Sequence, residues 1–125
     1  MRIDVVFIDI DGAKVNEVID VFVKQAQGRI RKKTNSAVIA LPADPNNANS
    51  PHKGTSEITI TQYEDYVGVM GALPYDSNYM QWSNYLWLIL TRALPHHMRL
   101  EVQDCHDNII YEAERPAVSA EKPVA

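Results

Sequence analysis

Six short segments of this chain have the composition of β-strands, whereas only two have the periodicity of helices. The strand-like segments span residues 3–10, 37–41, 57–63, 66–70, 98–103 and 109–111. Neighbouring parallel strands need a long crossover, usually a helix, so two helices cannot connect six parallel strands. We therefore expect an α+β fold in the order β-α-β-β-β-α-β-β, with a mostly antiparallel sheet of about five or six strands and both helices packed on one face.

The two expected helices, residues 13–27 and about 77–93, differ in how much apolar surface they carry. The first has one apolar stripe at a spacing of three and four, formed by Val15, Val18, Ile19, Phe22, Val23 and Ala26, and Gly28 supplies its stop. The second begins near a capping Asp76 or Ser77. Its stripe, centred on Trp82 and Leu86, is widened by Tyr85, Trp87 and Leu88. This helix is therefore buried on two sides or contacts a partner.

The 125 residues suffice for one domain, which we place at residues 1–115. Residues 43–56 hold turn formers and read as a mobile loop, and residues 116–125 as a flexible tail. The single cysteine suits a reducing compartment, and no apolar run is long enough to span a bilayer. The first residues do not have the pattern of a signal peptide. We therefore expect a cytoplasmic protein without membrane contact.

The segment Asp9-Ile10-Asp11-Gly12 follows the first hydrophobic strand, and two carboxylates at this spacing can share a hard cation. These residues resemble the opening motif of haloacid dehalogenase-like phosphatases. The resemblance implies a magnesium-dependent phosphatase on a parallel sheet, with Asp9 as the nucleophile and Asp11 protonating the leaving group. Ala13 stands where that family usually has threonine.

Histidines 96, 97 and 106, Cys105, Asp104 and Asp107 are plausible zinc ligands in type. The strand 98–103 would separate the two groups by roughly 20 Å, so we expect no metal site and no cofactor. Cys105 lies among acids, which raise a thiol pKa and make a nucleophilic role unfavourable. The basic residues Arg29, Arg31, Lys32 and Lys33 either meet an anionic partner or complement the end of the first helix.

The expected terminal hairpin is acidic, because residues 100–114 contain no Lys or Arg. Together with the net charge of −4, this disfavours general nucleic-acid binding and favours a basic protein partner. We expect partner contacts from Glu101, Asp104, Asp107 and Glu112, with Tyr85 and Trp87 as aromatic anchors.

These surfaces favour a binding protein over an enzyme. Our leading hypothesis is a small bacterial or phage module that masks or inhibits another protein, in the manner of an immunity protein against a basic toxin or nuclease. The first alternative is the phosphatase built on Asp9 and Asp11. The second is a homo-oligomeric structural or phage accessory protein, such as a homodimer joined through an edge strand or the second helix.

Overall fold

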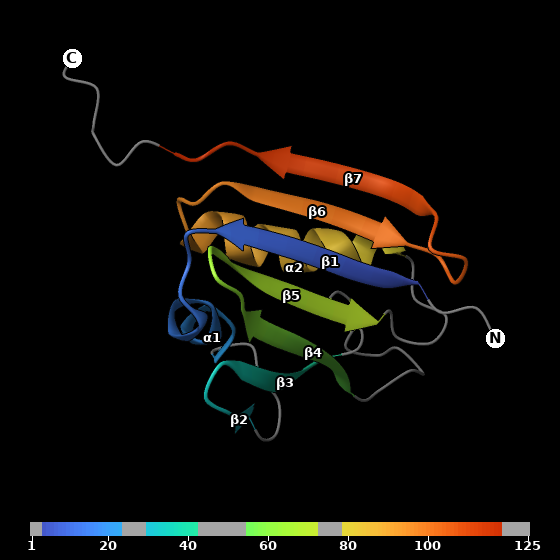
Figure 1. Cartoon of the computed structure of the whole chain (residues 1–125). Helices are drawn as coiled ribbons and strands as arrows, with labels where there is room; N and C mark the ends of the chain where they lie inside the picture. The colour runs from blue at the N-terminus through green and yellow to red at the C-terminus, as the bar shows by residue number, and fades with distance from the viewer. Residues whose placement is uncertain (1–3, 24–29, 43–54, 73–78, 119–125) are drawn as a thin grey trace, which may run out of the picture.

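The computed structural model describes residues 4–23, 30–42, 55–72 and 79–118. They form one seven-stranded sheet and two helices (Figure 1). In chain order the elements are β1 (Val5–Asp11), α1 (Val15–Val23), β2 (Ile30–Lys32), β3 (Ser36–Pro42), β4 (Thr55–Gln62), β5 (Tyr66–Ala72), α2 (Tyr79–Ala93), β6 (Met98–Gln103) and β7 (Ile109–Arg115). The spatial order of the strands is β2-β3-β4-β5-β1-β6-β7.

Each of the six neighbouring pairs in this sheet is antiparallel, which confirms the expected α+β class. The expected strand count was one too low, because Ile30–Lys32 forms the short edge strand β2 beside β3. Only Ile30 of this strand packs against the core. The other two residues are basic and exposed, so the segment lacks the apolar alternation that predicts a strand. β1 lies between β5 and β6, as its two apolar phases predicted.

Alternate residues of each strand divide the sheet into two faces that differ in burial. The helix face holds the buried apolar residues Val6, Ile8, Ile10, Ala37, Ile39, Ile58, Ile60, Val67, Val69, Met98, Leu100 and Val102. The opposite phase forms what we call the open face: Val5, Phe7, Asp9, Asp11, Val38, Thr59, Thr61, Tyr66, Gly68, Met70, Arg99, Glu101, Glu112 and Glu114. No described helix covers this face, which is toward the viewer in Figure 1.

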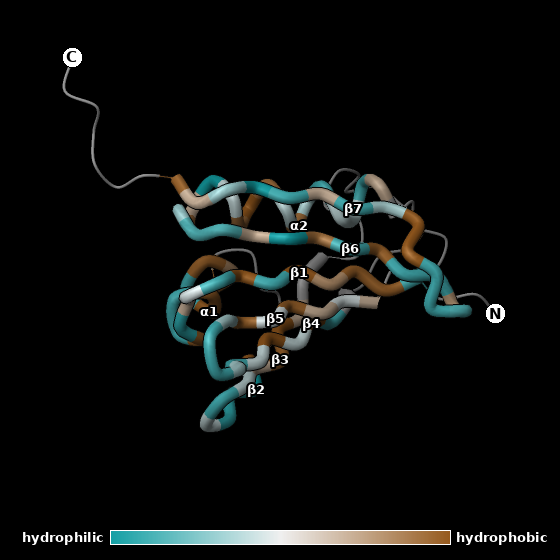
Figure 2. Tube along the Cα trace, turned by 45° about the horizontal axis from the view of Figure 1, so that its top comes forward, coloured by the Kyte–Doolittle hydropathy of each residue, from teal (hydrophilic) through white to brown (hydrophobic). Residues whose placement is uncertain are grey.

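Both helices pack on the helix face, as expected. α1 buries Val15, Val18, Ile19 and Phe22 against β3 and β4, and α2 buries Trp82, Leu86 and Leu90 over β1 and β6. Burying each such side chain contributes about 1.5–3 kcal/mol relative to leaving it in water. Along β6, the hydropathy colours of Figure 2 alternate between hydrophobic and hydrophilic, in agreement with one buried and one wet face.

The predicted helix ends and loops are only partly covered by the described residues. Residues 24–27 of the first predicted helix, Asp76 and Ser77 before the second, residues 43–54 of the predicted loop and residues 119–125 of the predicted tail lie outside them. Thr55 and Ser56, at the end of the predicted loop, instead begin β4. The Val118 N–H donates to the Pro95 carbonyl at 2.7 Å, which ties the start of the tail to the segment after α2.

Gln62, the last residue of β4, joins the sheet to the start of α1. Its side-chain oxygen accepts a hydrogen bond from the Val15 N–H at 2.8 Å. Its amide nitrogen donates to the carbonyls of Tyr63 at 2.9 Å, Tyr66 at 3.3 Å and Ala13 at 3.4 Å. The first N–H groups of a helix have no partner inside the helix, so this side chain satisfies one of them and fixes α1 to the β4–β5 turn.

Replacing Gln62 with leucine should lower the free energy of unfolding by about 1–3 kcal/mol. The partly buried Val15 N–H and the carbonyls of Ala13 and Tyr66 would each lose a hydrogen bond. Urea denaturation measures this change. Gln81→Leu is the control, since Gln81 is exposed on α2, and it should change stability by less than about 0.5 kcal/mol. Equal stability of the two variants would contradict the role of Gln62.

Candidate functional site

Acidic side chains gather on the open face over β1, β6 and β7. Glu101 and Glu112 are directly opposite each other in the β6–β7 register. Asp9 lies across from Arg99, and Arg99 lies across from Glu114. With Asp11 at the end of β1, five carboxylates therefore lie over these three strands with one arginine, Arg99. We call these five residues, Asp9, Asp11, Glu101, Glu112 and Glu114, the acidic patch.

The Glu101–Glu112 pair is unfavourable for the isolated fold. Like charges directly opposite in an antiparallel pair destabilise a sheet, by about 0.2–1 kcal/mol on the scale of such cross-strand pairs. The only hydrogen bond to Glu101 that the described residues supply comes from the Gln103 side chain at 3.3 Å. A cationic partner placed over this pair would relieve the repulsion.

Asp104 and Asp107 lie in the β6–β7 turn, away from this pair. Asp104 accepts hydrogen bonds from the backbone N–H groups of His106 at 2.8 Å and Asn108 at 3.0 Å. Asp107 is exposed and has φ of 64°, in the left-handed region that aspartate tolerates better than most residues. The carboxylate of Asp104 therefore shapes the turn, and of the four predicted acids only Glu101 and Glu112 share the open face.

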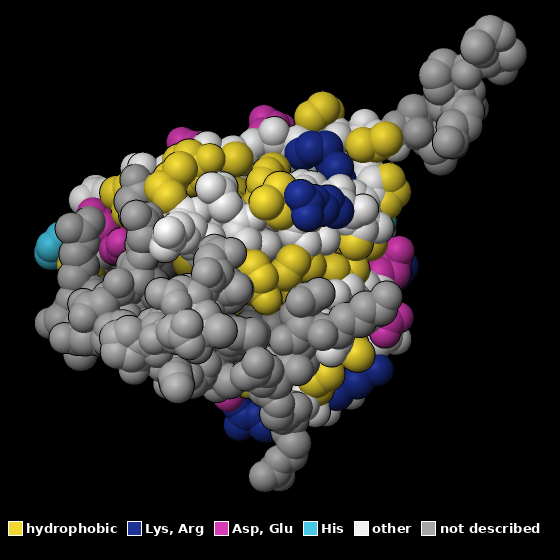
Figure 3. Space-filling view, turned by 180° about the vertical axis from the view of Figure 1, so that it is seen from behind, with side chains coloured by type: hydrophobic (Ala, Val, Ile, Leu, Met, Phe, Trp, Pro, Cys, Tyr) yellow, Lys and Arg dark blue, Asp and Glu magenta, His cyan; other side chains and the backbone are white. Residues whose placement is uncertain are grey.

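Tyr85 and Trp87, the predicted anchors, lie on α2 and so in the opposite layer from the acidic patch. Both are partly buried against the core, and Tyr85 stacks on Trp82 with ring centroids 5.8 Å apart. Burial also raises the pKa of Tyr85. The helix layer shows hydrophobic side chains interspersed with Lys and Arg, with Asp and Glu toward its margins (Figure 3). One flat partner surface therefore cannot contact both predicted sets of residues.

Other apolar and aromatic residues lie beside the acidic patch, and the sequence analysis did not single them out. Phe7 and Met70 are cross-strand neighbours on the open face, and Met70 is 45% exposed. Tyr63, in the β4–β5 turn, stacks on Tyr66 with centroids 4.8 Å apart and planes at 16°. The alternation of β5 could have placed Tyr66 and Met70 on one face, but the position of Tyr63 depends on the fold of its turn.

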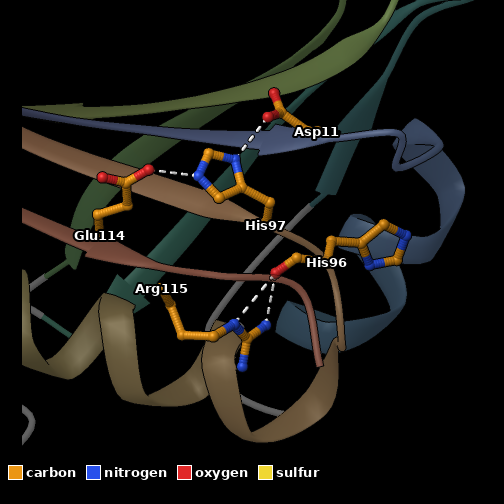
Figure 4. Close-up of polar contacts among 5 residues, drawn as sticks. All are labelled: Asp11, His96, His97, Glu114 and Arg115. Carbon is orange, nitrogen blue, oxygen red and sulfur yellow. Dashed lines mark hydrogen bonds and ion pairs between the residues drawn. The ribbon is translucent and has the colours of Figure 1, made fainter. Parts of the chain in front are cut away.

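His97 bridges two strands through two of these carboxylates (Figure 4). Its Nδ1 lies 2.6 Å from Asp11 Oδ2, and its Nε2 lies 2.5 Å from Glu114 Oε2. The Asp11 N–H also donates to the His97 carbonyl at 3.0 Å. The imidazole therefore connects the end of β1 to the edge strand β7, and both contacts are complete only when the ring carries two protons.

The hydrogen bonds to Glu114 and Asp11 raise the pKa of His97 above its ordinary value of 6.5. A raised pKa in the folded state means that protonated His97 stabilises the fold below pH 6.5, and that this contribution is lost as pH rises through the folded pKa. We expect an NMR titration of the imidazole to show this higher pKa. The free energy of unfolding should fall over the same pH interval in the native protein and not in His97→Gln. A titration midpoint at or below 6.5 would contradict the bridge.

At the same corner, Arg115 closes the end of α2 (Figure 4). Its guanidinium donates to the carbonyls of Leu94 at 2.5 Å, His96 at 2.7 Å and Thr91 at 3.2 Å. Its Nε donates to the same His96 carbonyl at 3.1 Å. The last carbonyls of a helix lack partners inside it and carry partial negative charge, so this arginine both satisfies and neutralises them.

Asp9 and Asp11, the residues of the phosphatase motif, do point to the same face of β1. The fold around them is the antiparallel sheet described above, so the parallel sheet with helical crossovers that the resemblance implies is not found. Within the described part of the chain, no group of three His, Cys, Asp or Glu side chains is arranged to hold a metal ion. The phosphatase hypothesis therefore continues to depend on the motif alone.

The pKa of Asp9 is raised above its ordinary value. Burial is the largest cause, the charge of Arg99 acts in the opposite direction, and the charges of Glu101 and Asp11 add to the increase.

Cys105 is exposed in the β6–β7 turn. No helix in the described ranges has the length and hydropathy needed to cross a bilayer. Comparisons with protein-family models, curated proteins and solved structures find no significant match to this chain.

Proposed function

We propose that this protein is a small binding module whose open face covers a basic surface of another protein. The observation that carries the proposal is the acidic patch, in which five carboxylates over three adjacent strands outnumber the two cationic side chains beside them, Arg99 and His97. Surfaces of one sign steer a partner of the opposite sign and raise the rate of association. The repulsion between Glu101 and Glu112 is a cost to the free protein that a cationic partner removes.

The apolar half of the open face supplies the part of an interface that excludes water. Phe7, Met70, Tyr63 and Tyr66 lie beside the acidic patch, on β1, β5 and the turn before β5. Aromatic and methionine side chains are enriched in interface cores, whereas charges concentrate at the rim. In this proposal these residues take the anchoring role first assigned to Tyr85 and Trp87.

The partner that best fits this surface is a nucleic-acid-processing protein, such as a basic toxin or nuclease. Such proteins carry a positive surface because they must neutralise phosphates. The carboxylates on adjacent strands of this sheet form an array of negative charges comparable to the phosphates of a nucleic acid. Covering the phosphate-binding surface would inhibit the target, as an immunity-type protein does.

The test compares capture by two variants with the same net charge. Glu101→Gln combined with Glu112→Gln removes two charges from the acidic patch, and Asp20→Lys produces an equal change at an exposed position on α1. Each variant is used as bait in lysate of the native source, and bound proteins are identified by mass spectrometry. We expect one basic, stoichiometric partner that the Asp20 variant retains and the double variant loses. Equal retention by both variants would overturn the proposal.

A further inference from the structure

Gly68 brings an aromatic ring and a carboxylate together on the open face. A Cβ added at Gly68 would lie 3.0 Å from Cε2 of Tyr63 and 3.7 Å from Oδ1 of Asp9. Because both atoms lie so close to one point, they are less than about 7 Å apart. Asp9 is the cross-strand neighbour of Gly68 on β1. Because Gly68 has no side chain, the Tyr63 ring can lie beside Asp9.

The ring of Tyr63 is held in place although it is 48% exposed. One side stacks on Tyr66. The Tyr63 N–H donates to the Tyr66 carbonyl at 2.8 Å, and the Tyr63 carbonyl accepts from Gln62 at 2.9 Å. An aromatic ring fixed in this way loses little conformational freedom when a ligand contacts it.

Asp9 is the carboxylate of the acidic patch that is available to a ligand at this point. It is partly buried, and the described residues offer it no hydrogen bond and no ion pair within 4 Å. Arg99, across from it on β6, acts on the Asp9 carboxyl through its charge but not through a contact within that distance. Asp11, the cross-strand neighbour of Tyr66, is by contrast bound by His97. A partly desolvated carboxylate without a donor favours a cation that brings its own N–H groups.

We propose that Tyr63 and Asp9 form a subsite for one arginine side chain of the basic partner. This inference rests on the proposed function and names the chemistry of its contact point. A guanidinium is planar, stacks on aromatic faces and donates in a fork to a carboxylate, and a cation acts on a ring within about 6 Å of its centroid. The separation of less than about 7 Å between ring edge and carboxylate suits a group that contacts both.

The probe for this subsite is the blocked tripeptide acetyl-Gly-Arg-Gly-amide, titrated into the isotope-labelled protein and followed by NMR. We expect saturable shifts of the Gly68 amide and the Tyr63 ring protons, and none with the uncharged citrulline peptide. Tyr63→Leu should weaken binding about two- to fivefold, and Tyr63→Phe, which keeps the ring, should not. Asp9→Asn should also weaken binding, whereas Asp20→Asn, at an exposed position on α1, should leave the Gly68 shifts unchanged.

Gly68→Ala tests the subsite without changing any charge, because its new methyl group would lie 3.0 Å from Cε2 of Tyr63 and the ring would have to shift by a few tenths of an ångström. It should weaken binding of the peptide, but less than Tyr63→Leu does. Shifts that avoid Gly68, or equal affinity in Tyr63→Leu and the native protein, would overturn the subsite. The proposed function would still be supported if the Glu101→Gln, Glu112→Gln variant failed to capture the partner from lysate. If that variant captured the partner as the native protein does, the proposed function would be wrong whatever the peptide showed.

Discussion

Replacing Arg115 with methionine should lower the free energy of unfolding by about 1.5–3 kcal/mol, the range for hydrogen bonds made by a charged group. The substitution keeps an unbranched apolar stem but removes the donors to Thr91, Leu94 and His96. Those carbonyls lie at and just beyond the C-terminal end of α2, where the helix dipole adds partial negative charge. Arg115 also lies at the end of β7, so the edge strand loses one of its attachments to the helix layer.

Urea or thermal denaturation measures the effect, and Arg99→Met is the matched control. Arg99 is exposed on the open face, where an ion pair contributes about 0–1 kcal/mol. The stability of Arg115→Lys should lie between those of the two methionine variants. Lysine keeps the positive charge but lacks the planar fork of donors that contacts three carbonyls at once. Equal loss of stability in Arg99→Met and Arg115→Met would show that these hydrogen bonds do not hold the corner together.

The class of the fold followed from the sequence because hydrophobic period is a strong local signal. Ile8 and Ile10 alternate with Asp9 and Asp11, and the register of the sheet keeps that alternation. Arg115 and Gln62 could not be predicted in the same way. Each reads locally as a polar residue at the end of a strand, and its importance comes from carbonyl or amide groups that the chain brings there from 19 or more residues away.

The candidate site was predictable only within one hairpin. Glu101 and Glu112 followed from the expected terminal hairpin, but strand order is not a local property, so nothing indicated that β1 lies beside β6. That neighbour relation adds Asp9 and Asp11 to the acidic patch. Helical period likewise predicted that Tyr85 and Trp87 flank the buried stripe of α2. It could not show that this helix and the hairpin acids lie on opposite sides of the sheet.

Replacing Glu112 with lysine should slow association with the basic partner about tenfold at low ionic strength, because the steering charge of the acidic patch falls where it is densest. The same change should raise the free energy of unfolding by about 0.2–1 kcal/mol, since lysine would then lie directly opposite Glu101. A variant that is more stable and yet binds more slowly distinguishes loss of a binding surface from damage to the fold.

Stopped-flow association with the partner recovered by capture, measured at low and high salt, decides this prediction. Asp20→Lys is the matched control, because it changes the net charge equally at an exposed position on α1. The rates of the native protein and Glu112→Lys should converge as salt increases, since the Debye length falls from about 30 Å at 0.01 M to about 3 Å at 1 M. Equal slowing by both variants would mean that overall charge governs encounter, and the open face would lose its assigned role.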